Sequence, residues 1–168
     1  MPRADADRIR NVALVGHRGS GKTSLNEALL FEAGAINRLG SVTDGTTVSD
    51  SAPDEKARGM SIASSLATFD WQGRKINLID TPGDAGFAGD TVAALRVVEG
   101  ALIVASAVMG VEVQTSRVWE RAEGLGLPRV VFVNMLDRER ADFYRALEQF
   151  RAQLSERCVA VHLPIGSE

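Results

Sequence analysis

The sequence lacks the features of disulfide-rich, membrane-spanning and basic nucleic-acid-binding proteins. Cys158 is the only cysteine, so no disulfide can form within the chain. The longest apolar run, residues 101–108, contains Ser106 and is too short to span a bilayer. The formal net charge of −3 gives no general attraction to DNA or to an anionic membrane surface. We therefore expect no membrane association and no direct DNA binding.

The N-terminal residues 1–8 carry too many charges for a secretory signal peptide. Together with the single cysteine, this predicts a cytoplasmic protein. The chain has 168 residues, of which 45% are hydrophobic, and this is enough to bury one sizeable core. Length and composition therefore predict a single domain over residues 1–168.

Strand and helix patterns alternate along the chain, as they do in parallel sheets that are covered by helices on both faces. Residues 34–59 have no sustained apolar periodicity and are predicted to form a long loop. The segment Trp71-Gln-Gly-Arg74 separates two apolar runs and predicts a hairpin turn. The other predictions are strands at 12–15, 61–69, 75–79, 101–107, 130–133 and 159–163, and helices at 22–32, 90–99, 113–125 and 140–155.

The most informative stretch is Gly16-His-Arg-Gly-Ser-Gly-Lys22-Thr23, which directly follows the apolar run 12–15. In a phosphate-binding loop, glycines let backbone N–H groups point at phosphate oxygens, a lysine reaches the β- and γ-phosphates, and a hydroxyl ligates Mg²⁺. The alternative is a glycine-rich turn with a surface lysine, but the flanking strand and helix patterns favour the phosphate loop. The predicted nucleotide-binding residues here are Gly16, His17, Arg18, Gly19, Ser20, Gly21, Lys22, Thr23 and Ser24.

A second motif, Asp80-Thr-Pro-Gly83, stands at the end of the predicted strand 75–79. A carboxylate at that place can hold the water shell of Mg²⁺, and the Gly83 N–H can meet a γ-phosphate. Alone, this sequence is equally typical of an ordinary turn. Its position after a strand that follows the phosphate loop favours a functional site.

These two motifs, together with Asn134-Met-Leu-Asp137, resemble the GTP-binding domain of translational GTPases. Longer stretches, Val111-Glu-Val-Gln-Thr115 and Pro128-Arg-Val-Val-Phe-Val-Asn134 among them, are similar to elongation factor G. The resemblance extends over residues 11–167, and the opening stretch is most similar to the elongation-factor-G-like paralogues. It implies an α/β fold of the P-loop NTPase G-domain type, a three-layer sandwich whose mostly parallel sheet has one antiparallel hairpin strand.

The same resemblance implies GTP or GDP and Mg²⁺ as cofactors, and the ribosome as a partner. The family continues into an inserted subdomain and a last base-binding loop. We therefore expect residues 1–168 to be a G domain that is truncated before both, and we expect ribosome contact mainly through domains absent from this chain.

Carried over by position, the resemblance assigns Lys22 to the phosphates and Thr23, Ser61 and Asp80 to the metal site. Ser61 stands where the family places a threonine, and it keeps the hydroxyl. The loop at 40–60 would then become ordered with GTP and relax after hydrolysis. The alternative is a flexible surface loop without a switching role.

The resemblance also assigns the guanine site. Asp137 would pair with the N1–H and the exocyclic amine of guanine, and Asn134 would brace the pocket. Met135 replaces the family's lysine, so we expect guanine selectivity with reduced affinity. The alternative is that Asn134 and Asp137 merely cap the following helix.

Three departures from the family surround the expected γ-phosphate. Asp84 occupies the position of the histidine that orients the attacking water, and an ionised carboxylate only accepts hydrogen bonds and adds negative charge. Gly86 and Gly19 each replace a family aspartate. The expected catalytic set is therefore Lys22, Gly83 and Asp84, with weak GTPase activity. The alternative is that Asp84 is protonated or turned away from the phosphates, with the water held by backbone groups.

Two hypotheses from different classes follow. The first is a GTPase with slow or impaired hydrolysis, coupled to ordering of the switch loop. The second is a non-hydrolysing, GTP-dependent binding switch that acts at the ribosome. An ATP-binding protein outside translation is a weaker third reading.

Overall fold

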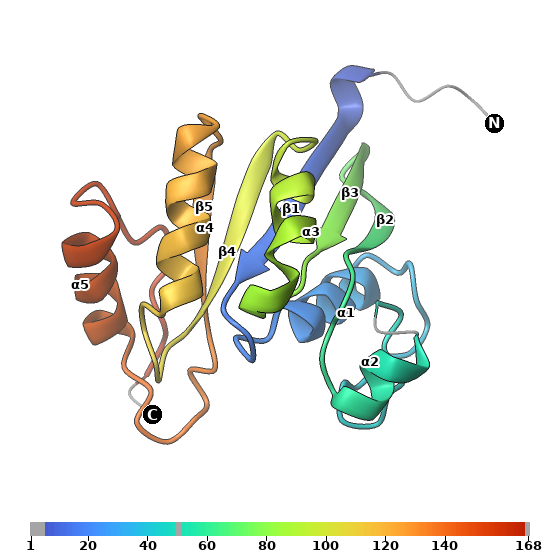
Figure 1. Cartoon of the computed structure of the whole chain (residues 1–168), viewed down its shortest axis with the longest axis horizontal. Helices are drawn as coiled ribbons and strands as arrows, with labels where there is room; N and C mark the ends of the chain where they lie inside the picture. The colour runs from blue at the N-terminus through green and yellow to red at the C-terminus, as the bar shows by residue number, and fades with distance from the viewer. Residues whose placement is uncertain (1–5, 50–51, 167–168) are drawn as a thin grey trace.

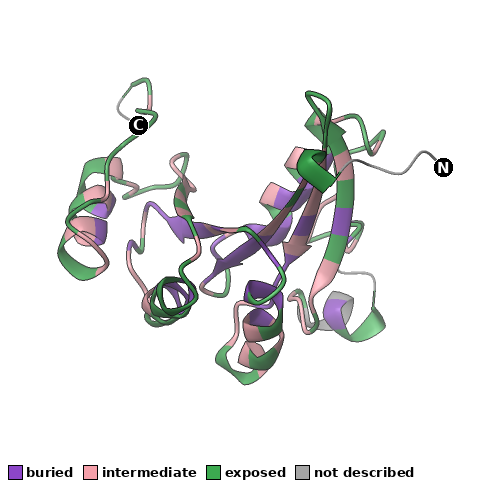
Figure 2. Cartoon of the chain, turned by 90° about the horizontal axis from the view of Figure 1, so that it is seen from above, coloured by how far each residue is buried: buried purple, intermediate pink, exposed green. Residues whose placement is uncertain are grey.

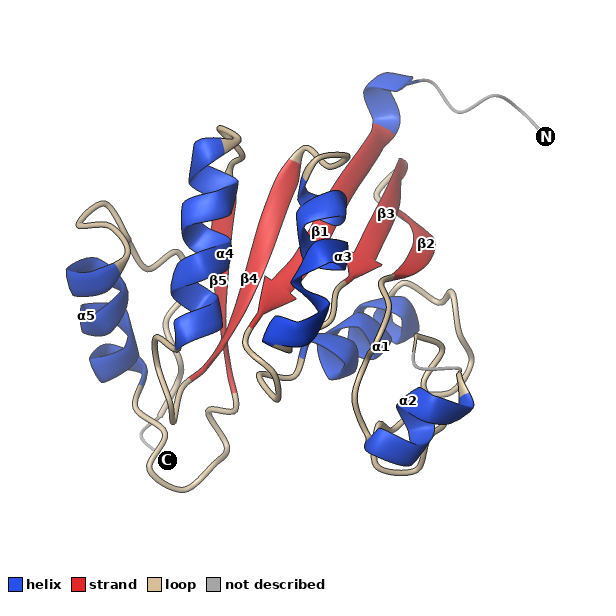
Figure 3. Ribbon diagram, in the orientation of Figure 1, coloured by secondary structure: helices blue, strands red, loops and turns tan. Residues whose placement is uncertain are grey.

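The computed structural model describes residues 6–49 and 52–166. Within these ranges, no helix combines the length and the apolar character needed to cross a membrane. In chain order, the elements are η1 (Ala6–Arg8), β1 (Ile9–Gly16), α1 (Lys22–Glu32), α2 (Pro53–Arg58), β2 (Ser65–Trp71), β3 (Arg74–Asp80), η2 (Ala85–Phe87), α3 (Ala88–Leu95), β4 (Gly100–Ser106), α4 (Val113–Gly124), β5 (Arg129–Asn134) and α5 (Phe143–Gln153) (Figure 3).

A five-stranded sheet forms the middle layer, in the order β2-β3-β1-β4-β5 (Figure 1). Strand β1 pairs in parallel with β3 and β4, and β5 pairs in parallel with β4. Strand β2 is antiparallel to β3. The central strands β1 and β4 are buried along their carboxyl-terminal halves. Because both faces of these buried parts are covered, residues 12–15 and 101–105 are apolar without alternation.

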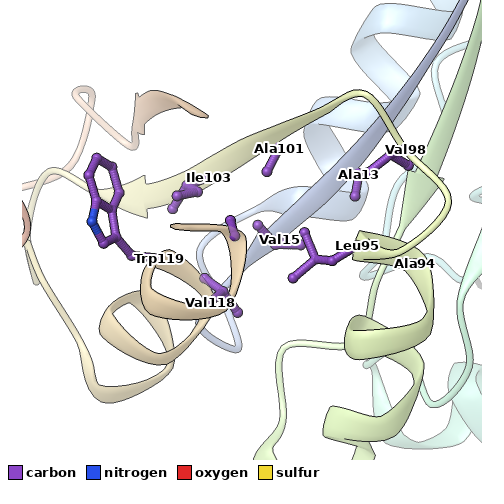
Figure 4. Packing of buried hydrophobic residues seen from close by; sticks show 10 residues of the cluster. Ala13, Val15, Ala94, Leu95, Val98, Ala101, Ile103, Val118 and Trp119 are labelled. Atoms are coloured by element: carbon purple, nitrogen blue, oxygen red, sulfur yellow. The ribbon is translucent and has the colours of Figure 1, made fainter. Parts of the chain in front are cut away.

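Helices cover both faces of this sheet (Figure 2). Helix α1 lies on one face, where Leu30 packs against Leu14 and Val104. Helices α3, α4 and α5 lie on the opposite face. The largest cluster there joins β1 and β4 to α3 and α4, and its labelled members are Ala13, Val15, Ala94, Leu95, Val98, Ala101, Ile103, Val118 and Trp119 (Figure 4). The predicted three-layer α/β fold is therefore confirmed.

The antiparallel strand arises from the predicted hairpin turn. Gln72 and Gly73 have φ angles of 48° and 74°, and Trp71 pairs with Arg74. Two consecutive residues with positive φ are typical of the two-residue turns that match the twist of a hairpin. The hairpin is confirmed, although β2 begins at Ser65 and the predicted strand began at residue 61.

Two predicted elements are wrong. The loop predicted over residues 34–59 contains α2, which Pro53 starts with its fixed φ and which is too short to show a helical period. The strand predicted at 159–163 is not part of the sheet in the described chain. Its apolar side chains are exposed, Val161 by 81%, so this apolar run buries nothing that would offset the entropy cost of ordering a strand.

Two predicted helices are shorter in the structure. The helix predicted at 90–99 is α3, which begins after the short helix η2 and ends at Leu95. The helix predicted at 140–155 is α5, which begins at Phe143 because the Asp142 carboxylate accepts the Arg145 N–H at 2.9 Å.

The end of the sheet farthest from the phosphate loop is held by Glu99. This carboxylate accepts the backbone N–H of Asn11 at 2.6 Å and its side-chain amide at 2.9 Å. The Glu99 N–H in turn donates to the Asn11 carbonyl at 3.0 Å. The hydrogen bonds from Asn11 lower the pKa of Glu99. The segment between α3 and β4 is thereby fixed to the start of β1.

We expect Glu99→Gln to lower the free energy of unfolding by about 0.5–1 kcal/mol at pH 7, a value reduced for the exposure of this side chain. Because folding lowers the pKa of Glu99, its contribution to stability is complete above the pKa of the unfolded state and is lost as the pH falls through the lower pKa of the folded state. Urea unfolding between pH 7 and pH 3 should show the difference between wild type and variant shrinking. Glu120→Gln, on the exposed face of α4, is the control, and a difference that is constant with pH would contradict the expectation.

Candidate nucleotide-binding site

The carboxyl ends of β1 and β3 border a hollow of about 220 Å³, which we call the phosphate hollow. Ligands of open α/β sheets bind at this edge, outside the carboxyl ends of the strands. Its lining residues are Arg18, Gly19, Gly21, Lys22, Thr23, Ser24, Val42, Gly59, Met60, Ser61, Gly83 and Met135. Residues predicted for the phosphates and for the metal therefore meet at one place.

The predicted phosphate loop connects β1, which ends at Gly16, to α1, which begins at Lys22. Lys22 is buried, and its Nζ donates to the carbonyl oxygens of Gly16 at 3.3 Å and His17 at 2.9 Å. These contacts hold the ammonium group over the loop. The N-terminus of α1 opens at the same hollow, and the partial positive charge of a helix N-terminus favours an anion there.

Asn134 braces the phosphate loop from the end of β5. Its Nδ2 donates to the Ser20 carbonyl oxygen at 2.9 Å. Gly21 has a φ of 92° and lies so close to the same amide that a Cβ would collide with it. Met135 follows Asn134 with a φ of 62° and lines the hollow. The cap of α5 is Asp142, so Asn134 does not serve the capping role that was its alternative.

The second motif reaches the phosphate loop through β3. Thr81 donates its N–H at 3.2 Å and its hydroxyl at 2.6 Å to the Leu14 carbonyl oxygen on β1. Two residues later, Gly83 lies against the Arg18 backbone and the Lys22 Nζ, and a Cβ at this position would collide with both. Only a glycine fits this approach without displacing the loop.

Two hydroxyl groups face each other at the predicted metal site. The Thr23 and Ser61 oxygens are 3.2 Å apart, although the two residues come from α1 and from the loop before β2. Asp80 is buried at the end of β3, in register with Leu14. In the described part of the chain, no group of three or more histidine, cysteine or acidic residues is arranged so that it could hold a metal ion. Hydroxyl oxygens beside a phosphate site suit Mg²⁺, which is held by few protein ligands together with phosphate oxygens and water.

Asp84 lies at the edge of this region and is held by two contacts. Its Oδ1 accepts the Gly86 N–H at 2.8 Å and so caps η2. Its Oδ2 is 3.9 Å from Nη1 of Arg18 in the phosphate loop. The sequence predicted the position of Asp84 but not this pairing with a loop arginine.

Asp137 is not among the residues that line the phosphate hollow. Its side chain is 80% exposed and lies 3.9 Å from the Arg138 guanidinium. It lines a second hollow of about 440 Å³, together with Leu136, Ala141, Asp142, Phe143, Tyr144, Pro164, Ile165 and Gly166. Its role toward guanine stays a prediction.

Sequence reasoning missed one neighbour of the loop. The His17 Nε2 is 3.4 Å from Glu112 Oε1, at the residue that precedes α4. Glu112 lies within a stretch that carries the family resemblance, but nothing in its local sequence indicates a contact with a residue so far along the chain.

Residues 7–164 match the family model of the elongation factor Tu GTP binding domain. The chain belongs to this family. The match covers the strands, the phosphate loop and the Asp80–Gly83 motif described above, so it confirms the resemblance to translational GTPases. Membership of a GTP-binding domain family makes GTP and GDP the expected ligands of the phosphate hollow.

Individual relatives of the chain are consistent with this family. The chain is 42% identical over 164 residues to elongation factor G of Thermotoga petrophila, which covers 98% of this chain and 24% of that protein. It is 42% identical over 159 residues to mitochondrial ribosome-releasing factor 2 of Candida dubliniensis, covering 95% of this chain and 20% of that protein. A solved structure from Thermus thermophilus is similar with a TM-score of 0.84 and 45% identity, over 88% of this chain and 22% of that one. The chain thus spans a fifth to a quarter of these proteins' lengths.

We expect Gly83→Ala to raise the Kd for GTP by at least about tenfold, because the new Cβ must displace the Arg18 backbone or the Lys22 ammonium, at a cost typical of overpacking. Titration with a fluorescent GTP analogue measures this. Gly89→Ala is the matched control, since a Cβ at Gly89 meets nothing within 4 Å and its φ is not in the positive range. Equal affinities for the two variants would show that the close approach of Gly83 does not matter for binding.

Proposed function

We propose that this domain binds GTP with Mg²⁺ and hydrolyses it slowly, as the G domain of a protein similar to elongation factor G. The observation that carries this proposal is the convergence of Lys22, Thr23, Ser61 and Gly83 on one hollow. Together they supply an ammonium group, a backbone N–H and two hydroxyl groups, which a bound triphosphate and its Mg²⁺ need.

The assignments follow from the groups present. The Lys22 ammonium would neutralise phosphate charge, and the Gly83 N–H would donate to the γ-phosphate. The hydroxyls of Thr23 and Ser61 would hold Mg²⁺, with Asp80 acting on its water shell. Bound Mg²⁺ would neutralise the charge that develops on the phosphate oxygens during transfer. The chain's own part is to bind and orient the triphosphate at the end of the sheet.

Slow hydrolysis follows from Asp84. An ionised carboxylate cannot donate a hydrogen bond to an attacking water, and it repels the negative charge of the triphosphate. The Gly86 N–H and the Arg18 guanidinium contact this carboxylate and hold it beside the phosphate loop. We therefore propose weak turnover by a site that is otherwise equipped to bind GTP.

The same observation supports a second candidate, a GTP-dependent binding switch without useful hydrolysis. In this case the state of the loop at 40–60 would report bound GTP to a partner, which we propose to be the ribosome. The names of the relatives, elongation factor G and ribosome-releasing factor 2, agree with such a partner. We further propose that the protein acts in the cytoplasm and that ribosome contact comes mainly from segments outside residues 1–168.

Single-turnover GTP hydrolysis, with and without ribosomes, separates the two candidates. We expect slow turnover in the wild type, and we expect Asp84→His to raise the rate by roughly a hundredfold, the gain typical of a positioned acid or base. Asp70→His adds a histidine on β2, outside the residues that line the phosphate hollow, and should leave the rate unchanged. Intact GTP under all conditions would favour the non-hydrolysing switch, while no gain with Asp84→His would mean that another residue limits the reaction.

Competition between nucleotides tests the guanine assignment. We expect ATP to displace a bound GTP analogue at least about a hundredfold less well than GTP, because adenine cannot satisfy a carboxylate that pairs with guanine. Asp137→Ala should remove most of this difference, whereas Glu139→Ala, an exposed neighbour, should keep it. Equal displacement by ATP and GTP in the wild type would exclude the proposed role of Asp137.

A further inference from the structure

The segment that carries Ser61 is folded around one buried carboxylate. Glu55, on α2, is only 6% exposed. Its Oε1 accepts the N–H groups of Ile62 at 3.0 Å and Ala63 at 3.3 Å, and its Oε2 accepts the Ala52 N–H at 3.2 Å. A buried carboxylate is costly unless hydrogen bonds satisfy it, and these three backbone donors do so.

Two of these donors directly follow Ser61 in the chain. Gly59 ends α2 in the left-handed conformation, with a φ of 59°, and turns the chain back over the helix. The Met60 N–H then donates to the Glu55 carbonyl oxygen at 3.2 Å. Backbone and side chain of Glu55 therefore bind the chain on both sides of Ser61, whose hydroxyl lies 3.2 Å from that of Thr23.

We propose that Glu55 is a positioning residue, which holds the Ser61 hydroxyl at the metal site and thereby makes GTP binding dependent on Mg²⁺. This inference rests on the proposed function. Serine lacks the β-methyl group that restricts the χ1 angle of threonine. The direction of the Ser61 hydroxyl therefore depends more on its backbone, and that backbone is fixed by Glu55.

The rest of the loop has anchors of its own. The Glu27 carboxylate, buried on α1, accepts the N–H groups of Gly40 and Val48. On the other side, Asp90 of α3 accepts the Ser64 N–H at 2.9 Å. A change at Glu55 therefore loosens residues 59–63 while the flanking parts of the loop stay attached to the two helices.

The central variant is Glu55→Gln, which keeps the size of the side chain but turns an amide NH₂ toward backbone donors. Asp54→Asn, an exposed neighbour on the same helix, is the matched control. The affinities for GTP and GDP are measured as a function of Mg²⁺ concentration. We expect Glu55→Gln to raise the Mg²⁺ midpoint for GTP binding by about tenfold, as the loss of hydrogen bonds to a charged group implies, with GDP affinity within about twofold of wild type.

A purely structural role would weaken GTP and GDP binding equally, and this result would overturn the proposal. A double-mutant cycle with Ser61→Ala gives a second criterion. If Glu55 acts through Ser61, the double variant binds GTP no more weakly than Ser61→Ala alone. Additive losses would contradict the inference.

Hydrogen exchange of the Ile62 and Ala63 amides at saturating GTP and Mg²⁺ tests the geometry independently of the affinity measurements. We expect both amides to be protected in the wild type and at least about tenfold faster in Glu55→Gln. Glu55→Asp, which withdraws the carboxylate by one methylene, serves if the glutamine variant fails to fold. If the wild type does not bind GTP in an Mg²⁺-dependent way, the proposed function is wrong. If the two amides are unprotected, or if the Glu55 variants behave like wild type, only this inference is wrong.

Discussion

The site depends on the parallel pairing of β1 with β3. The phosphate loop follows β1 and the Asp80–Gly83 motif follows β3, so pairing Leu14 with Asp80 makes both motifs leave the sheet at the same edge. The two hydrogen bonds from Thr81 to the Leu14 carbonyl extend this alignment past the end of the strand. A shift of one residue in this register would separate Gly83 from the loop. Binding geometry is therefore a property of the sheet's core as much as of the loop residues.

Much of this arrangement could be predicted from the sequence, because strands and phosphate loops have local signatures. The apolar run before Gly16 and the turn at Gln72 and Gly73 identified the sheet and its antiparallel edge. Helix α2 could not be predicted in this way, because six residues show no period and its stability comes from Glu55 hydrogen bonds to residues outside the helix. The strand predicted at 159–163 is wrong for a different reason, because an apolar run forms a strand only where a neighbouring strand pairs with its backbone.

Contacts between side chains far apart in the sequence were the least predictable part of the site. Two side-chain pairs join the phosphate loop to other segments, Arg18 with Asp84 and His17 with Glu112. No local sequence pattern predicts either pair. The two ends of the site also differ in construction. The phosphate loop is held by close backbone contacts and buried polar groups, whereas the side chain of Asp137, for which a role toward guanine is predicted, is exposed. The prediction that the base is guanine therefore rests more on family membership than on the geometry of Asp137.

The packing of the two tryptophans has a practical consequence for spectroscopy. Trp119, on α4, is buried in the hydrophobic core, with the Arg129 guanidinium 4.4 Å from its ring centre. Trp71, at the hairpin, is 44% exposed. As these are the only tryptophans, the chain carries one emitter inside the hydrophobic layer and one at the solvent-facing end of β2. Their emission should differ in wavelength and in quenching by added iodide. Intrinsic fluorescence therefore distinguishes melting of the core from fraying of the hairpin without any introduced label.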